Sequence, residues 1–266
     1  MRIGRIVVMT FGCVIAAAAQ DRVTVPLTDP SQPVTIHAKT LMGNIRVTAG
    51  TGRDLIVSSS DNVSGRRIVN DPAPPGMTRI GGRPGLDIEE DHNVVTVSSS
   101  SLGRGGDLII ETPVNTSLQL KAVTGSIDVT GVHGDQEVES VNGSITLTNV
   151  SGSVVAHTVN GGVTVSLDRI TENKPMSFTS LNGKVDVSLP PDTKARLRLK
   201  SDRGSIYSDF EVKIEPEASK PTIADSRNQN GKYKISVDRA VTGTINGGGP
   251  EYTFQTMNGN ILIHRK

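Results

Sequence analysis

Histidine and acidic side chains are the groups in this sequence that could bind a metal ion or transfer a proton. No two histidines show the His-x-x-x-His or His-Glu-x-x-His spacing of a metal site. We expect solvent-facing strand or corner positions for all five of them, which are His37, His92, His133, His157 and His264. The sequence therefore predicts neither a metal site nor a bound cofactor.

The run Glu89-Glu90-Asp91-His92 is the densest acidic cluster in the chain. It could hold a cation weakly, but such a run is more typical of a solvated turn. The glycine tracts at 103–106 and 247–249 lack the Gly-Lys-Ser/Thr that completes a phosphate loop. The Gly-x-Ser-x-Gly turn of serine hydrolases does not occur either. These patterns identify no catalytic residue.

Two acids on the outward side of the repeat described below are the remaining candidates for catalysis. The equivalent outward positions are Asp128, Thr146, Thr164 and Asp186. In a regular stack, two Thr-bearing coils would hold the two acids roughly 14 Å apart, too far for paired-carboxylate chemistry. Aromatic platforms for sugars are also scarce, since the chain has three Tyr, four Phe and no Trp. We therefore expect no enzyme, with a carbohydrate-active β-helix (polysaccharide binding, lyase or hydrolase) as the alternative.

An eight-residue motif recurs along the chain: Ser/Thr, apolar, Asn, Gly, any residue, Ile/Val, any residue, aliphatic. Its copies begin at Ser140, Thr158, Ser180 and Thr256, and a variant with Met in place of Asn begins at Thr40. Glycines recur every nine residues from Gly125 to Gly161, but the identities around them recur every eighteen. Each unit therefore contains two different halves, each a strand followed by a corner.

The repeat predicts an all-β fold, a single-stack parallel β-solenoid with about 18–22 residues per coil. The two aliphatic residues after each Gly are two positions apart, so they point to the same side of a strand and would form apolar columns inside the stack. The alternative is an antiparallel β-meander or sandwich, because Asn-Gly between alternating strands is also a strong hairpin signal. The eighteen-residue identity favours the solenoid, since a meander does not require alternate turns to match.

The Asn-Gly pairs are expected to be structural corners. A sharp corner favours Gly, and Asn tolerates the positive φ that such corners can need. Stacked corners would also align the asparagines into a buried row of amides that hydrogen-bond from coil to coil. The corner residues are Asn142, Gly143, Asn160, Gly161, Asn182, Gly183, Asn258 and Gly259. We expect no binding role for them.

The first 19 residues have the features of a secretory signal peptide. Arg2 and Arg5 precede a mostly apolar run at 6–19, which ends in Ala17-Ala18-Ala19. About 14 apolar residues are too few for a bilayer span, which needs roughly 20. We therefore expect cleavage after the last of these alanines and no transmembrane span afterwards. The single cysteine, Cys13, lies in this run, so the mature chain would fold without disulfides.

The mature chain divides into two parts by pattern. Residues 20–110 form an N-terminal β segment with a Pro/Gly-rich excursion at 61–85, and residues 111–266 carry the regular repeats, with a polar break at 215–231. The formal net charge is only +1, which gives no reason to expect nucleic acid as a partner.

The repeats and the motifs around them resemble a known family. The run 107–113, Leu189-Pro190, the Gly-Gly-Gly-Pro at 247–250 and the final copy at 256–261 are similar to the bacterial putative-adhesin family of unknown function. The resemblance covers roughly residues 34 to 266 and implies a secreted or surface-attached β-solenoid without catalytic residues. We therefore expect an exported, non-enzymatic protein with a structural or adhesion role at the cell envelope, in the periplasm, on the cell surface or outside the cell. Its partner would be an envelope or surface protein or glycan.

Overall fold

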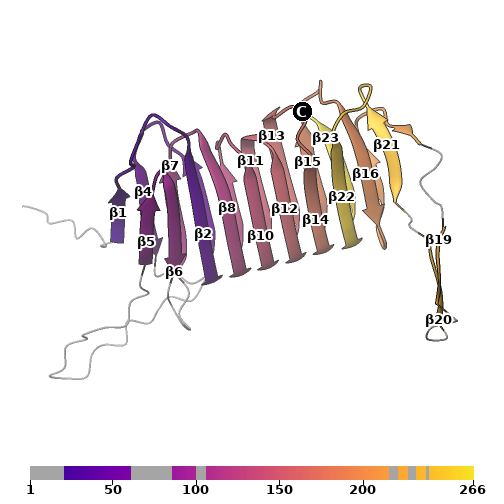
Figure 1. Ribbon diagram of the computed structural model, residues 1–266, viewed down its shortest axis with the longest axis horizontal. Coiled ribbons are helices and arrows are strands. Elements are labelled where there is room, and N and C mark those ends of the chain that lie inside the picture. The colour runs from indigo at the N-terminus through magenta and orange to yellow at the C-terminus, as the bar shows by residue number, and fades with distance from the viewer. Residues whose placement is uncertain (1–20, 61–85, 100–105, 216–220, 227–231, 238–239) are drawn as a thin grey trace, which may run out of the picture.

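The computed structural model describes residues 21–60, 86–99, 106–215, 221–226, 232–237 and 240–266 (Figure 1). All regular elements in these residues are β-strands, and they form two large mixed sheets and one two-stranded sheet. The expected signal peptide at 1–19, the excursion at 61–85 and most of the glycine tract at 103–106 lie outside the described residues. The prediction of an all-β fold is confirmed.

Each large sheet runs along the long axis of the molecule. The first sheet has ten strands in the order β1 (Asp21–Val25), β4 (Leu55–Ser60), β7 (Asp107–Thr112), β3 (Ile45–Ala49), β9 (Ile127–Thr130), β11 (Ile145–Gly152), β13 (Val163–Ile170), β15 (Val185–Leu189), β23 (Ile261–Arg265) and β17 (Ile206–Ser208). The second has eleven in the order β18 (Lys213–Ile214), β21 (Val241–Ile245), β16 (Ala195–Ser201), β22 (Glu251–Asn258), β14 (Met176–Asn182), β12 (Val154–Asn160), β10 (Gln136–Asn142), β8 (Thr116–Thr124), β2 (Val34–Met42), β6 (Val94–Ser99) and β5 (Leu86–Asp91).

The middle of both sheets is parallel. Strands β8, β10, β12, β14 and β22 pair in parallel in the second sheet, and β9, β11, β13, β15 and β23 do so in the first. Consecutive strands such as β10 and β11 lie in different sheets, so the chain alternates between the sheets and makes one coil for every two strands. A hairpin meander would instead pair β10 with β11, and it does not describe this region.

The expectation of parallel pairing throughout is wrong at both ends of the stack. There β4 pairs antiparallel with β1 and β7, β5 with β6, and β21 with β16 and β18. An end coil has no neighbour on one side, and its unpaired N–H and C=O groups would be open to other chains. Short antiparallel strands cover three of the four sheet edges, and β17, which pairs in parallel with β23, ends the first sheet.

The coils do not stack in the order of the sequence. The coil of β2 and β3 lies between those of β6–β7 and β8–β9, and the C-terminal coil of β22 and β23 lies between those of β14–β15 and β16–β17 (Figure 1). Phe254 of β22 therefore stacks on Phe178 of β14, with ring centroids 5.0 Å apart. The weak repeat copy around Gly204 is displaced to the outside of the stack.

The core lies between the two sheets. The first aliphatic position after each corner glycine is fully buried in every coil of the middle region, as the side chains of Ile127, Ile145, Val163, Val185 and Ile261 show. The aromatic side chains Phe178, Phe254 and Tyr252 are also buried. The interior columns predicted from the alternation are therefore present.

The expected polar break at 215–231 contains a β-strand. Residues 221–226, inside the expected polar break, form β19 (Pro221–Ser226), which pairs antiparallel with β20 (Lys232–Val237) in a sheet of their own.

The expected boundary between the N-terminal segment and the repeats, between residues 110 and 111, lies inside β7. Strand β2 of the N-terminal segment also pairs directly with β8 of the repeats. The N-terminal segment and the repeats thus share hydrogen-bonded sheets.

The corner glycines are required by close approach of the backbone. A Cβ on Gly143, Gly183 or Gly259 would collide with the carbonyl oxygen of the corner glycine in the preceding coil. These three glycines are outside the left-handed region, and none of the four corner asparagines has a positive φ. The expectation that positive φ selects the Asn-Gly pair is therefore wrong at these positions, because the approach of neighbouring coils excludes a side chain there.

Hydrogen bonds connect successive corners at several points. The Gly143 N–H donates to Asn160 O over 3.0 Å, and the Gly161 N–H donates to Asn182 O over 3.1 Å. Hydroxyl groups before the corner, such as that of Thr158, donate to a glycine carbonyl of the preceding coil, here Gly143 O at 2.8 Å. The corner backbone therefore sets the spacing and register of the coils.

The asparagine side chains form a ladder along the stack. Asn160 Nδ2 donates to Asn142 Oδ1 over 2.8 Å, Asn182 Nδ2 to Asn160 Oδ1 over 2.8 Å, and Asn258 Nδ2 to Asn182 Oδ1 over 2.6 Å. These side chains lie at the surface, so the expectation of a buried row is wrong. The corner directs the amide along the outside of the stack, since the interior is occupied by the aliphatic columns.

The adjacent residues Gly161 and Gly162 allow a matched test of the corner geometry. Gly161→Ala places a methyl group against Gly143 O, and we expect it to lower the free energy of unfolding by about 3 kcal/mol, at the upper end of overpacking costs. Gly162→Ala meets its nearest atoms at 3.5 Å or more, and we expect a change within about 0.5 kcal/mol. Urea unfolding measures both, and equal losses would contradict the close-approach argument.

The amide ladder is tested by Asn160→Asp. An ionised carboxylate can accept from Asn182 but cannot donate to Asn142, so we expect a loss of about 1–2 kcal/mol in urea unfolding at pH 7. The loss relative to wild type should shrink at pH 3, where a protonated carboxyl can donate. Thr164→Ala, on the outer face of the same coil, is the control and should change stability by less than about 0.5 kcal/mol. A ladder without energetic value would leave Asn160→Asp as stable as this control.

Candidate functional site: an apolar stripe on the second sheet

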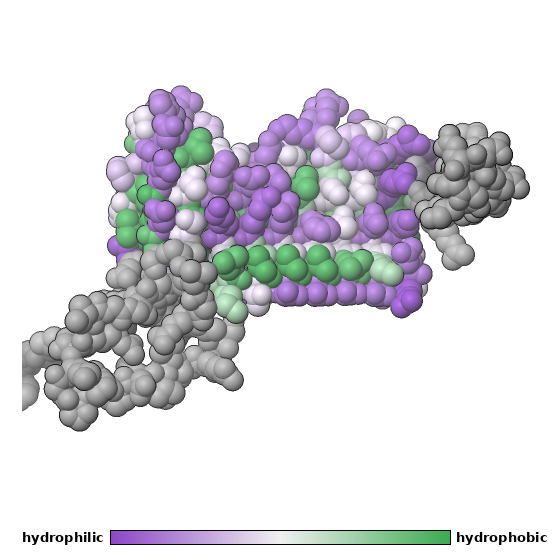
Figure 2. All heavy atoms as spheres, turned by 60° about the horizontal axis from the view of Figure 1, so that its bottom comes forward, coloured by the Kyte–Doolittle hydropathy of each residue, from purple (hydrophilic) through white to green (hydrophobic). Residues whose placement is uncertain are grey.

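A single row of aliphatic side chains runs along the outer face of the second sheet. It is formed by the apolar residue that precedes each corner, and we call it the stripe: Leu41, Val123, Val141, Val159, Leu181 and Met257. Leu41 is 55% exposed, and Met257, the least exposed of the five that the structure leaves open to solvent, is still 40% exposed. Figure 2 shows an unbroken row of hydrophobic side chains here, bordered by a row of hydrophilic ones.

The stripe arises because successive side chains of a strand point alternately into the core and outward. In β10 the buried positions are Gln136, Val138 and Ser140, so the next residue, Val141, points outward. The same offset recurs in β8, β12, β14 and β22, whose registers align these positions from coil to coil. Because the backbone of these strands is hydrogen-bonded on both sides, the stripe offers side chains only and no free sheet edge.

A groove of about 580 Å³ follows the stripe over β2, β8, β10 and β12, with Ser98 of β6 at its end. Leu41, Val123 and Val141 supply apolar surface along it. Polar side chains two positions earlier in the strands border the same groove: Lys39, Lys121, Glu139 and His157. The groove therefore combines a narrow apolar track with charged groups along one side.

The charges along the groove are unevenly balanced. Lys121 Nζ lies 3.0 Å from Glu139 Oε2, and this hydrogen bond, with the charge of Glu139, raises the pKa of the Lys121 ammonium. Lys39 lies directly beside Lys121 in the sheet register. Within the described part of the chain, no hydrogen bond or ion pair reaches the Lys39 side chain. The β2 end of the groove thus carries a lysine that forms no ion pair with the described residues.

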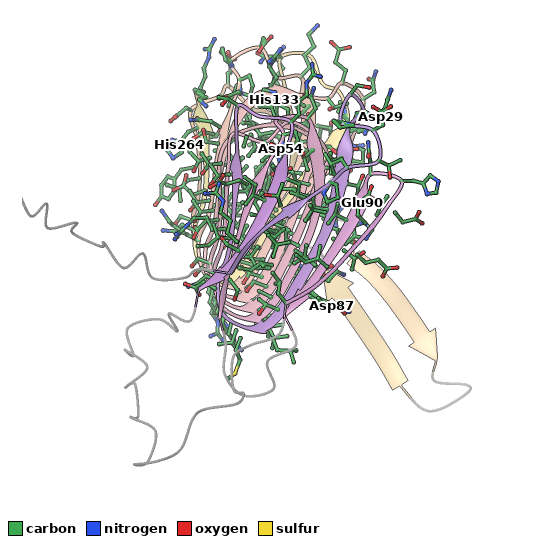
Figure 3. All side chains as sticks on the ribbon, turned by 90° about the vertical axis from the view of Figure 1, so that its left-hand side faces the viewer. Asp29, Asp54, Asp87, Glu90, His133 and His264 are labelled. Carbon is green, nitrogen blue, oxygen red and sulfur yellow. The ribbon has the colours of Figure 1, made fainter. Side chains whose placement is uncertain are left out.

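The histidines and acids considered from the sequence are dispersed. Of these residues, Figure 3 labels Glu90, His133 and His264, which lie apart from one another. His264 contacts two carboxylates, with Nδ1 3.0 Å from Asp209 and Nε2 3.5 Å from Asp186. In the described residues, no three His, Cys, Asp or Glu side chains are placed so that they could hold a metal ion.

The acidic run at 89–92 comprises the last three residues of β5 and His92, the first residue of the turn that leads to β6. His92 and Asn93 both have positive φ, as a tight two-residue hairpin turn requires. The Glu90 carboxylate accepts from the N–H groups of Asn93 and Thr28 at 3.0 and 3.1 Å and from the Thr28 hydroxyl. These bonds lower the pKa of Glu90, with the Asn93 N–H as the largest cause. The carboxylate is thus engaged in shaping the turn.

The two outward acids lie in separate coils. The register of the first sheet places Asp128 beside Thr146, Thr146 beside Thr164, and Thr164 beside Asp186. Two coils therefore separate the carboxylates, as expected. Asp186 is instead paired with Lys184 at 2.9 Å, on its own strand.

The sequence-based expectations did not identify the stripe. The sequence draws attention to the corner Asn-Gly pairs, which are expected to be structural and which lie next to the stripe. The sequence did contain a signal for the stripe, the apolar residue before each Asn. This residue is an odd number of positions from the buried residues of its strand, so its side chain points outward. Within the residues that the structure describes, there is no helix long and apolar enough to cross a membrane.

Two solved structures are similar to this chain. A solved structure from Clostridium sporogenes ATCC 15579, described as a putative cell adhesion protein, matches with a TM-score of 0.52 at 11% identity, covering 93% of this chain and 100% of the other. A structure from Bacteroides fragilis NCTC 9343, described as a putative adhesin, matches with a TM-score of 0.40 at 13% identity, covering 94% and 98%. At such identities the first match shows the fold alone. No curated protein matches the chain.

The resemblance noted from the sequence is confirmed at the level of the family. The family model described as Toastrack DUF4097 matches residues 4–263, nearly the whole chain. The repeat copies, the Gly-Gly-Gly-Pro corner and the final Asn-Gly coil all lie within the matched residues. This protein therefore belongs to the Toastrack DUF4097 family.

Proposed function

We propose that this chain is an exported, non-enzymatic β-solenoid that binds a partner at the bacterial cell envelope through the stripe. The observation that carries the proposal is the apolar row from Leu41 to Met257, exposed at five of its six positions, with its adjoining groove. Apolar side chains exposed singly are ordinary on a protein surface, but a contiguous row is typical of an interaction site. The adhesin-like descriptions of the structural neighbours are compatible with such a role.

The distribution of polar groups supports binding over catalysis. The paired aromatics Phe178 and Phe254 are in the core, where they cannot serve as sugar platforms. The outward acids Asp128 and Asp186 lie two coils apart. In the groove itself, Glu139 is already paired with Lys121.

The proposal includes the organisation of the whole chain. Residues 1–19 would direct export and be removed, and residues 20–110 and 111–266 would form one stack of coils, closed at each end by antiparallel strands. The corner residues at 142–143, 160–161, 182–183 and 258–259 would hold the stack together and leave binding to the stripe beside them. The hydrogen bonds from corner to corner support this assignment.

The stripe is tested by Val141→Glu in the native organism. We expect a strain that carries only this variant to lose surface attachment or envelope integrity to the extent of a gene deletion, because a charge interrupts the apolar row at its middle. Thr164→Glu, on the outer face of the first sheet, is the control and should behave as wild type. Equal thermal stability of the two purified variants would show that folding is intact.

Two results would contradict the proposal. If Val141→Glu supported surface attachment and envelope integrity as well as the wild-type chain does, the stripe would have no part in the function. Cleavage of a polysaccharide by the purified protein, abolished by Asp128→Ala or Asp186→Ala, would instead support the carbohydrate-active alternative.

A further inference from the structure

We infer that the groove along the stripe binds the acyl chain of a long-chain fatty acid, with the carboxylate beside Lys39. The inference rests on the proposed function, because it names the ligand of the same surface. Its starting points are the narrowness of the apolar track, the absence of free backbone hydrogen-bonding groups along it and the position of the unpaired ammonium group.

The stripe is one side chain wide except at β2, where Met42 next to Leu41 is also exposed. The charged residues Lys39, Lys121 and Glu139 border it on one side, and from β10 to β22 the amide ladder borders it on the other. Its length spans six coils, and neighbouring parallel strands are about 4.8 Å apart, so the row extends roughly 24 Å. A narrow apolar track of this length fits one hydrocarbon chain.

A protein partner fits the surface less well. A stable protein interface uses roughly 20–30 residues on each side, whereas the stripe offers six aliphatic side chains. An added β-strand would need free N–H and C=O groups, and the strands under the stripe are paired on both sides. A hydrocarbon chain needs no hydrogen bonds and has no repeat that must match the coil spacing.

A bilayer surface also fits less well. Peripheral binding to anionic membranes typically uses a broad apolar face or a cluster of about four to eight Lys and Arg residues. Here the apolar row is narrow, and Lys121 is neutralised by Glu139. The groove volume of about 580 Å³ lies within the usual range of small-molecule sites, roughly 300–1,000 Å³.

The charge pattern orients the ligand. Lys39 stands at the β2 end of the groove beside Lys121, and within the described residues no carboxylate contacts it. An anionic head group there would supply the missing countercharge. The chain would then lie over Val123, Val141 and Val159 toward the middle of the stripe.

The test is calorimetric titration of the purified exported chain with palmitate below its micelle concentration. We expect saturable binding that Val141→Asp reduces by at least about tenfold, because a buried charge would oppose the hydrocarbon. Val155→Asp is the matched control, since Val155 is 44% exposed on the same outer face but lies outside the groove. It should bind palmitate as wild type does.

The head-group assignment has its own variant. Lys39→Met keeps the length of the side chain and removes its charge, so palmitate affinity should fall by about tenfold. Binding of hexadecanol, which lacks the carboxylate, should be unchanged by Lys39→Met. Equal effects on both ligands would overturn the assignment of the carboxylate to Lys39.

Two results would indicate another occupant, and either of them would overturn the inference. Vesicles of anionic phospholipid bound by wild type but not by Val141→Asp, without binding of free palmitate, would indicate a bilayer. A dimer that Val141→Asp dissociates, again without palmitate binding, would indicate a second copy of the chain. Lack of palmitate binding together with loss of attachment in Val141→Glu would sink the ligand but keep the proposed function. Palmitate binding with normal attachment in Val141→Glu would keep the ligand but overturn the proposed function.

Discussion

The structure depends on one close approach, that of the backbone of each corner to the backbone of the next. The corner N–H donates to a carbonyl of the adjacent coil, and the carbonyl of the neighbouring corner glycine occupies the space that a Cβ would need. This contact sets the register of the coils, and the register aligns everything else. The aliphatic columns inside, the amide ladder at the corner and the stripe outside are three consequences of one repeated geometry.

Much of the fold follows from the sequence, because the eighteen-residue identity separates two halves and the alternation within each strand separates inside from outside. The order of the coils does not follow, since any good copy of the repeat can stack on any other. The copy with Asn258 can extend the amide ladder and place Phe254 on Phe178, whereas the copy before Gly204 has Arg203 at the Asn position. The antiparallel ends depend on which coils are left exposed, and this is known only once the order is known.

The candidate site was less accessible from the sequence than the fold. The motif drew attention to its Asn-Gly pair, and the apolar residue before it has the character of a core residue until its parity is compared with that of Val138 and Ser140. The unpaired Lys39 depends on the coil order as well. Strands β2 and β8 are more than seventy residues apart in the chain, and their pairing places Lys39 beside Lys121. Lys121 forms its ion pair with Glu139, so Lys39 has no carboxylate partner there.

The central claim, that corner contacts stack the C-terminal coil between two coils that precede it in the sequence, is tested most directly by disulfide trapping in a Cys13→Ser background. Leu181 of β14 lies beside Met257 of β22, and Met257 lies beside Asp202, which follows β16. Neighbouring strands are about 4.8 Å apart, within the Cα separation that a disulfide spans. The account predicts that Leu181→Cys with Met257→Cys crosslinks on mild oxidation, while Leu181→Cys with Asp202→Cys does not. The opposite result would show that the coils stack in the order of the sequence and would contradict it.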